Sequence, residues 1–114
     1  MNDRTELLAR LLKLERPLGP VLEKLAEFGW DSDQELLEVS ASDIRSALQA
    51  YIDKKASSVE IEEWANAIEC REDLKIMGKV KEAIHILANP ILTFPLSLQS
   101  ALKLIDSLNT EKTS

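Results

Sequence analysis

Cys70 and His85 are the only cysteine and the only histidine of the 114-residue chain, which makes them its one candidate for a nucleophile and an activating base. A catalytic pair of this kind needs a thiolate beside an imidazole, with a third polar group such as Asn66 or Asn89 to orient the ring. The spacing of the two residues does not specify that geometry, and Cys70 is expected near a helix end, where a thiolate is not favoured. The pattern therefore favours a structural cysteine and a half-buried histidine over a catalytic site.

Three acidic residues alternate in the way that the first ligands of a calcium-binding loop do, namely Asp31, Asp33 and Glu35. That loop requires glycine at its sixth position for the turn, and Leu36 stands there in this chain. No cluster of cysteine and histidine suits zinc, and there is neither a glycine-rich phosphate loop nor a Gly-x-Ser-x-Gly motif. We interpret Asp31 and Asp33 as helix-capping carboxylates, and we expect no metal, no cofactor and no enzymatic activity.

A row of polar side chains recurs at positions i, i+4, i+7 and i+11 of one predicted helix: Glu62, Asn66, Glu69 and Asp73. Residues 27–73, which include this row, contain thirteen acidic and four basic residues, a net charge of −9, whereas the whole chain carries −6. Such a field attracts basic surfaces and repels phosphate backbones. The row therefore predicts a docking surface for a basic protein partner and argues against nucleic-acid binding.

A second acidic group would extend this surface if its segment packs beside the helix that carries the row. It consists of Asp31, Asp33, Glu35 and Glu38. The alternative for both groups is an ordinary solvated helix face, whose charge serves only solubility. Trp30 and Trp64 are expected to belong to the core, although a partly exposed tryptophan would be a natural binding hot spot.

Seven short helices are predicted from apolar residues at helical spacing and from the start signals that precede them. Capping boxes at Ser32–Glu35 and Ser57–Glu60 mark two helix starts, and Ser40 and Ser97 mark two more. The predicted helices cover residues 5–15, 17–28, 32–38, 40–55, 57–73, 80–88 and 97–108.

The segment from Ile91 to Leu96 joins the last two predicted helices, and its large apolar side chains predict a buried connector. Pro90 and Pro95 disfavour helix there. The chain has only three glycines and four prolines, and no stretch alternates convincingly as a strand. The sequence therefore predicts an all-α fold, in which residues 1–114 form a single domain built as a compact or solenoid-like helical bundle.

The N-terminus lacks the basic start and the apolar centre of a signal peptide, and the longest apolar runs are only a few residues. A single cysteine excludes an intrachain disulfide and suits a reducing compartment. We expect a soluble cytoplasmic protein that does not enter a membrane and that is a monomer or a weak dimer.

Three sequence segments stand out together: Trp30-Asp31-Ser32-Asp33, Glu63-Trp64-Ala65-Asn66-Ala67-Ile68-Glu69 with Arg71-Glu72-Asp73, and Leu87-Ala88-Asn89-Pro90. In combination they resemble small all-helical bacterial proteins, some of which are immunity proteins of contact-dependent growth inhibition (CDI) systems. The resemblance covers roughly Phe28 to Pro90, a little over half of the chain. The short tyrosine-bearing helix that marks colicin-type four-helix immunity proteins is absent, so the chain is not assigned to that group.

The resemblance implies a protein that binds and neutralises a toxin domain, often a nuclease, delivered by neighbouring cells. Carboxylates of the inhibitor would then occupy the places of phosphates in a basic cleft of the toxin. Our leading hypothesis is such an immunity protein, and the alternative is a generic helical adaptor with an endogenous partner or with a second copy of itself.

Overall fold

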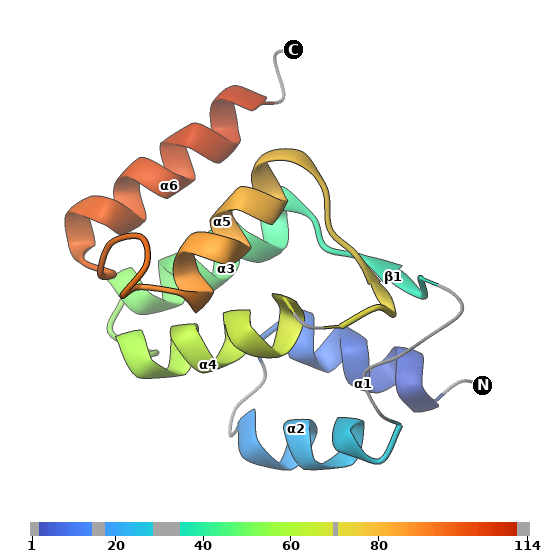
Figure 1. Cartoon of the computed structure of the whole chain (residues 1–114). Coiled ribbons are helices and arrows are strands. Elements are labelled where there is room, and N and C mark those ends of the chain that lie inside the picture. The colour runs from blue at the N-terminus through green and yellow to red at the C-terminus, as the bar shows by residue number, and fades with distance from the viewer. Residues whose placement is uncertain (1–2, 15–17, 29–34, 70, 112–114) are drawn as a thin grey trace.

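Six helices and two very short strands make up the part of the chain that the structure, a computed structural model, describes: residues 3–14, 18–28, 35–69 and 71–111 (Figure 1). The elements are, in order, α1 (Asp3–Leu12), α2 (Leu18–Ala26), β1 (Leu37–Glu38), α3 (Ala41–Ile52), α4 (Ser58–Glu69), β2 (Leu74–Lys75), α5 (Gly78–Ala88) and α6 (Leu98–Glu111). The predicted all-α class is confirmed, with six helices among the described residues in place of about seven.

The predicted helix over residues 32–38 is wrong in its C-terminal half, because Leu37 and Glu38 form β1; residues 32–34 lie outside the described part. β1 pairs in parallel with β2, with Leu37 opposite Leu74. The backbone N–H of Leu36 also donates to the carbonyl of Asp73 at 2.7 Å. A helix of about seven residues is marginal by itself, so hydrogen bonds from a distant segment decide its conformation.

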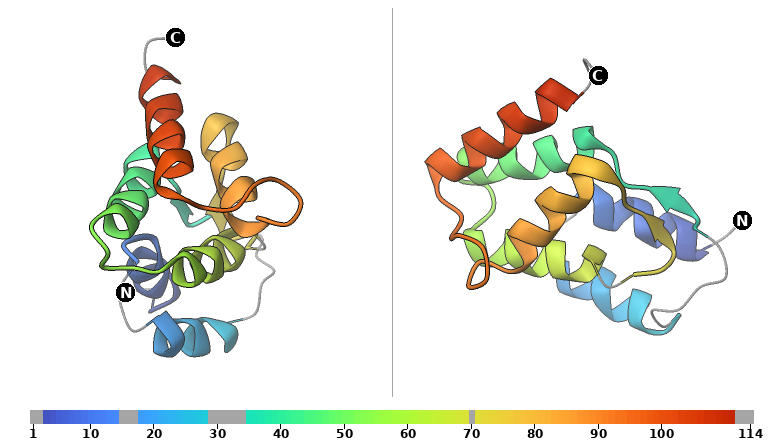
Figure 2. Two further views of the ribbon diagram at one scale, coloured as in Figure 1. Left: turned by 90° about the vertical axis from the view of Figure 1, so that its left-hand side faces the viewer. Right: turned by 45° about the horizontal axis from the view of Figure 1, so that its top comes forward.

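α4 lies in the middle of the molecule, with α1 and α2 on one side and α5 on the other (Figures 1 and 2). α3 and α6 pack against each other beyond α5. The radius of gyration is 13.6 Å, close to the value of about 13 Å expected of a compact domain of this length. No helix in the described ranges combines the length and the hydrophobicity that crossing a membrane requires.

Trp64 is fully buried, as its place in the apolar stripe of α4 predicts, and its indole N–H donates to the carbonyl of Leu11 at 2.6 Å. This bond satisfies the one polar atom of the ring and joins the middle of α4 to the end of α1. Ile61 and Ile68, one turn to either side, are also fully buried. The core prediction for Trp64 is therefore confirmed, whereas Trp30 lies outside the described residues.

Hydroxyl caps start three of the helices as predicted. The Ser57 hydroxyl accepts the N–H of Glu60 at 3.1 Å, and the Glu60 carboxylate accepts the N–H of Ser57 at 2.9 Å, which is a complete capping box. Ser40 forms a second box with Asp43, and Ser97 accepts the N–H of Ser100 at 3.1 Å. These local bonds fix where α3, α4 and α6 begin.

Candidate functional site

The helix α4 carries the first three residues of the predicted acidic row on the flank that its buried stripe leaves free. Its sequence contains four glutamates and neither lysine nor arginine. Their position follows from the fold, because burial of Trp64 and its neighbours forces the opposite flank outward. α4 is therefore a rigid support for a strip of negative charge.

Glu62 and Asn66 lie one turn apart on this strip. The Asn66 side chain is exposed, and its amide donates to the backbone carbonyl of Glu62 at 3.1 Å. Glu62 is only partly exposed, because it forms part of the wall of a pocket described below. The two residues are adjacent on the surface, as predicted.

Glu69 joins the end of α4 to the end of α5. Its carboxylate lies 2.8 Å from Nδ1 of His85 and accepts hydrogen bonds from the Asn89 amide at 3.2 and 3.4 Å. The Asn89 amide also donates to the His85 carbonyl at 2.8 Å. His85 is more exposed than the half-buried histidine predicted, and Cys70 lies outside the described residues, so the structure does not place the Cys–His pair.

Asp73 does not belong to the exposed row. α4 ends at Glu69, and Asp73 is completely buried next to β2. Its carboxylate accepts bonds from Nε and Nη2 of Arg71 at 2.9 and 3.0 Å and from Nε of Arg4 at 2.7 Å. The prediction of an exposed position failed because the i+11 spacing assumed a helix that continues four residues further than α4 does.

The ion pairs of Asp73 also set its protonation state. Burial by itself raises the pKa of the carboxyl group, but the hydrogen bonds and positive charges of Arg71 and Arg4 outweigh burial. They hold the pKa of Asp73 below its ordinary value of 3.8. Asp73 is therefore an ionised carboxylate that connects the start of α1 to β2.

The second predicted acidic group is only partly described. Asp31 and Asp33 lie outside the described residues, whereas Glu35 and Glu38 are exposed, with Glu38 in β1. Glu35 directly precedes Leu36, whose N–H bonds to Asp73, so Glu35 lies beside β2 and not on a helix packed along α4. Among the described residues, no group of three or more His, Cys, Asp or Glu side chains is arranged to hold a metal ion.

The largest departure from expectation is the connector between α5 and α6, which was predicted to be buried. The side chain of Ile91 is 97% exposed, that of Leu92 is 76% exposed, and that of Phe94 is 42% exposed. Residues 89–102 contain no charged residue. The segment has the composition of a core but lies on the surface.

The connector is held in place by local hydrogen bonds at both of its ends. The Thr93 hydroxyl donates to the carbonyls of Asn89 at 2.8 Å and Ile86 at 3.1 Å. At the other end, the Ser100 hydroxyl donates to the carbonyl of Pro95 at 3.2 Å. These bonds fix the backbone while Ile91 and Leu92 remain in solvent.

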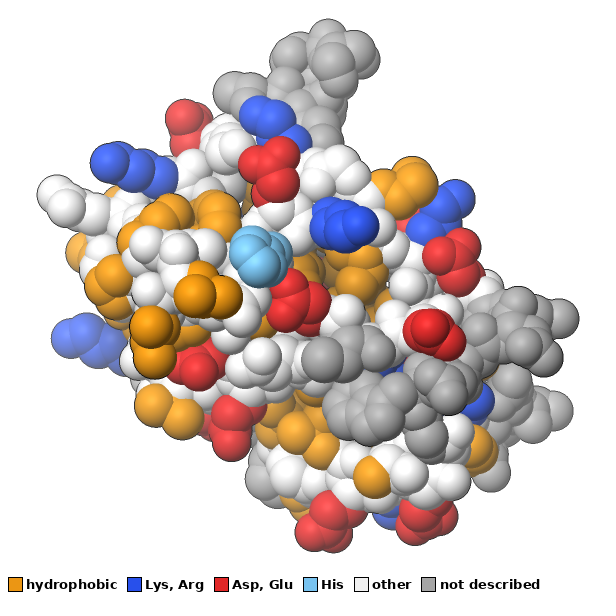
Figure 3. Space-filling model, viewed as in Figure 1, with side chains coloured by type: hydrophobic (Ala, Val, Ile, Leu, Met, Phe, Trp, Pro, Cys, Tyr) orange, Lys and Arg blue, Asp and Glu red, His pale blue; other side chains and the backbone are white. Residues whose placement is uncertain are grey.

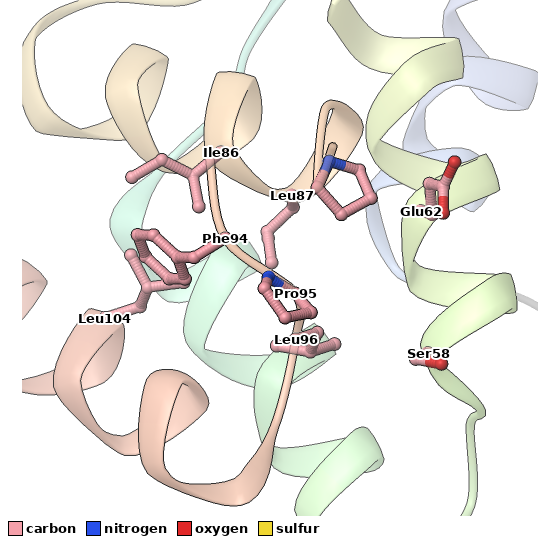
Figure 4. A pocket seen from close by; sticks show the side chains of 9 residues that line it. Ser58, Glu62, Ile86, Leu87, Phe94, Pro95, Leu96 and Leu104 are labelled. Carbon is pink, nitrogen blue, oxygen red and sulfur yellow. The ribbon is translucent and has the colours of Figure 1, made fainter. Parts of the chain in front are cut away.

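A pocket of about 200 Å³ lies between this connector and α4 (Figure 4). Its lining comprises Ser58 and Glu62 of α4 and the apolar side chains of Ile86, Leu87, Pro90, Phe94, Pro95, Leu96 and Leu104. Among the described residues of that lining, Glu62 is the only charged one, and it comes from the opposite side to Phe94 and Pro95 (Figure 4). The predicted row thus borders an apolar cavity that sequence reasoning missed.

One face of the molecule displays these features together. Figure 3 shows hydrophobic side chains gathered over the connector between α5 and α6, with acidic side chains beside them over α4. Contiguous exposed apolar surface of this kind commonly marks a binding site. The arrangement suits recognition of another molecule.

Comparison of the chain with protein-family models, with curated proteins and with solved structures yields no match.

Proposed function

We propose that this protein is a cytoplasmic immunity protein that binds and neutralises a basic toxin domain, in particular a nuclease, and that it acts by stoichiometric binding without catalysis. One observation carries the proposal: α4 contains four glutamates and no lysine or arginine, and it lies beside the exposed apolar connector. The sequence resemblance to CDI immunity proteins supplies the biological role.

The charge of α4 suits a partner that binds nucleic acid. A nuclease must attract phosphates, so its cleft is basic, and a strip of carboxylates is complementary to that cleft. Complementary charge raises association rates from roughly 10⁵–10⁶ to as much as 10⁸–10⁹ M⁻¹s⁻¹ at low salt. Rapid capture is what an inhibitor of an incoming toxin requires.

Co-expression with the toxins encoded beside the gene tests the proposal. We expect one of them to stop growth when expressed alone, and we expect growth to recover, with a 1:1 complex, when this chain is present. Glu62→Lys with Glu69→Lys should weaken the complex at least tenfold. The matched control is Glu23→Lys with Asp106→Lys, which changes net charge equally at exposed positions on α2 and α6.

The result against the proposal is equally direct. If none of the neighbouring toxins is neutralised or bound, the immunity role fails. Equal weakening by both double variants would also count against it, because charge at the α4 strip would then have no special importance.

The second candidate is a generic helical adaptor that binds an endogenous protein or a second copy of the chain. The exposed connector favours an adaptor as much as it favours an immunity protein, since an apolar surface serves any protein partner. A gene neighbourhood without toxins, or a stable homodimer in sedimentation experiments, would support the adaptor over the immunity protein.

A further inference from the structure

We infer that the pocket between α4 and the α5–α6 connector docks a partner segment in which a large apolar side chain is flanked by lysine or arginine. The inference rests on the proposed function, because it assumes a protein partner, and it goes further by naming the surface and the chemistry of the contact. The docking site consists of the pocket, the exposed side chains Ile91 and Leu92, and the carboxylate of Glu62.

The apolar half of the partner follows from the lining. Seven of the nine residues around the pocket are apolar, and its volume of about 200 Å³ accommodates one large side chain. Ile91 and Leu92, which lie in the chain between the lining residues Pro90 and Phe94, are largely exposed, so a partner that covers them removes apolar surface from water. Hot spots of protein interfaces are commonly side chains that fill a well-packed, desolvated pocket, with aromatic residues and arginine enriched among them.

The conformation of the connector favours binding because it is already ordered. Pro90 and Pro95 restrict the backbone, and the Thr93 hydroxyl holds it to the end of α5. A preformed surface loses little conformational entropy when a partner binds. The exposed side chains are therefore presented in a fixed arrangement.

The basic half of the partner follows from the charges around the pocket. Of the lining residues that the structure describes, Glu62 is the only charged one, and the other three glutamates of α4 have no lysine or arginine on their own helix. Lys54 and Lys55 lie further along the surface, where they line a separate hollow with Leu98 and Glu60. The acidic side of the docking site is therefore the Glu62 side, and a cation next to the anchoring side chain would pair there.

The same negative charges disfavour two other molecules that could cover an apolar surface, namely a second copy of the chain and an anionic membrane. A symmetric dimer through this site would bring Glu62 and the rest of α4 from each copy towards the same contact, where like charges repel. An anionic membrane surface is repelled for the same reason. A basic and apolar protein segment meets neither penalty.

The test is a titration of the ¹⁵N-labelled chain with two synthetic amphipathic peptides of 14 residues. One peptide contains leucine and lysine, and the other contains leucine and glutamate in the same pattern. We expect the lysine peptide to shift the amide signals of residues 89–96 and of Ser58 and Glu62, and the glutamate peptide to shift none of them. Binding of both peptides alike, or shifts confined to other surfaces, would overturn the inference.

Variants at exposed positions locate the site without endangering the fold. Ile91→Ser with Leu92→Ser should raise the Kd for the lysine peptide about tenfold, whereas Met77→Ser, at an exposed apolar residue before α5, should leave it within twofold. Glu62→Gln should raise the Kd about threefold and reduce its salt dependence. Glu63→Gln, an exposed neighbour that does not line the pocket, is its matched control.

Two further outcomes would contradict the chosen partner. Concentration-dependent dimerisation that Ile91→Ser abolishes would assign the surface to a second copy. Binding to vesicles of phosphatidylcholine and phosphatidylglycerol that the same variant abolishes would assign it to a membrane.

Failure of this inference and failure of the proposed function are distinguishable. If no toxin is neutralised but the lysine peptide binds as described, the immunity role fails and the docking site stands. If a toxin is neutralised and its affinity is unchanged by Ile91→Ser with Leu92→Ser, the docking site fails and the immunity role stands.

Discussion

Asp73 is buried and Ile91 is exposed, which is the reverse of where an aspartate and an isoleucine ordinarily lie. The aspartate is completely buried and makes ion pairs with two arginines, whereas the isoleucine is 97% exposed in the connector between α5 and α6. The buried carboxylate is compensated by specific partners, which is the condition under which burial of a charge is tolerated. The exposed isoleucine has no such compensation within the described residues, so its surface is available to another molecule.

The largest expected effect on stability comes from substitution of the buried Asp73. Asp73→Ala leaves Arg71, which is also buried, without its carboxylate, and should lower the free energy of unfolding by about 3–5 kcal/mol. Urea denaturation followed by tryptophan fluorescence measures the change. Glu63→Ala, at an exposed position on α4, should alter the stability by about 0.5 kcal/mol or less. Equal effects of the two substitutions would show that the Asp73 cluster is not a stabilising centre.

Acid should gradually remove the stabilisation that the ion pairs of Asp73 provide. Because the pKa of Asp73 is lower in the folded chain than its ordinary value of 3.8, the stabilisation from its ion pairs is complete above that value. It is lost as the pH falls through the folded-state pKa, when the carboxylate accepts a proton. Urea denaturation at pH 7, 5 and 3 should show a steeper loss of stability below pH 4 in the natural chain than in Asp73→Asn. Parallel curves for the two proteins would contradict this assignment.

A smaller effect on stability is expected from substitution of Thr93, whose hydroxyl holds the connector to the end of α5. Thr93→Val keeps the shape of the side chain but removes the hydroxyl that donates to Asn89 and Ile86, and should lower stability by about 1 kcal/mol. Hydrogen exchange of the amides in residues 90–96 should accelerate, while exchange of Trp64 and its neighbours in α4 should not change. Unchanged exchange in the connector would mean that Thr93 does not hold it.

The smallest effect is expected at the exposed side of the comparison. Ile91→Ser and Leu92→Ser should each change the free energy of unfolding by no more than about 0.5 kcal/mol, because neither side chain contributes to the core. Thermal denaturation measures this directly. A loss of several kcal/mol from either substitution would show that the connector is part of the core, and the contrast with Asp73 would disappear.

Local patterns predicted the helices well. The capping box at Ser57 and the buried stripe around Trp64 placed α4 within a few residues, because the bonds of a helix start and the burial of one helix face both act over short sequence distances. The same reasoning wrongly extended the helix, and with it the predicted acidic row, to Asp73, because periodicity alone does not reveal where a helix ends. Between Glu69 and Gly78 the sequence has no glycine or proline that would mark the end of the helix.

Of the candidate site, Glu62 and Asn66 are adjacent on the surface as predicted, and Glu69 contacts His85 and Asn89, which the sequence did not indicate. The pocket beside Glu62 was missed because residues from α4, α5, α6 and the connector build it together. The connector was predicted to be buried from its composition, and composition does not say whether a neighbouring element has room to cover a segment.

The sequence by itself determined the helical class, the starts of α3, α4 and α6, the burial of Trp64 and the negative charge of α4, because each depends on residues within a few turns of one another. Only the tertiary structure decided that Leu37 and Glu38 form a strand, that Asp73 is buried between Arg4 and Arg71, and that Ile91 and Leu92 face solvent. Those outcomes depend on hydrogen bonds, ion pairs and packing between segments that are distant in the chain, and local periodicity carries no information about such contacts.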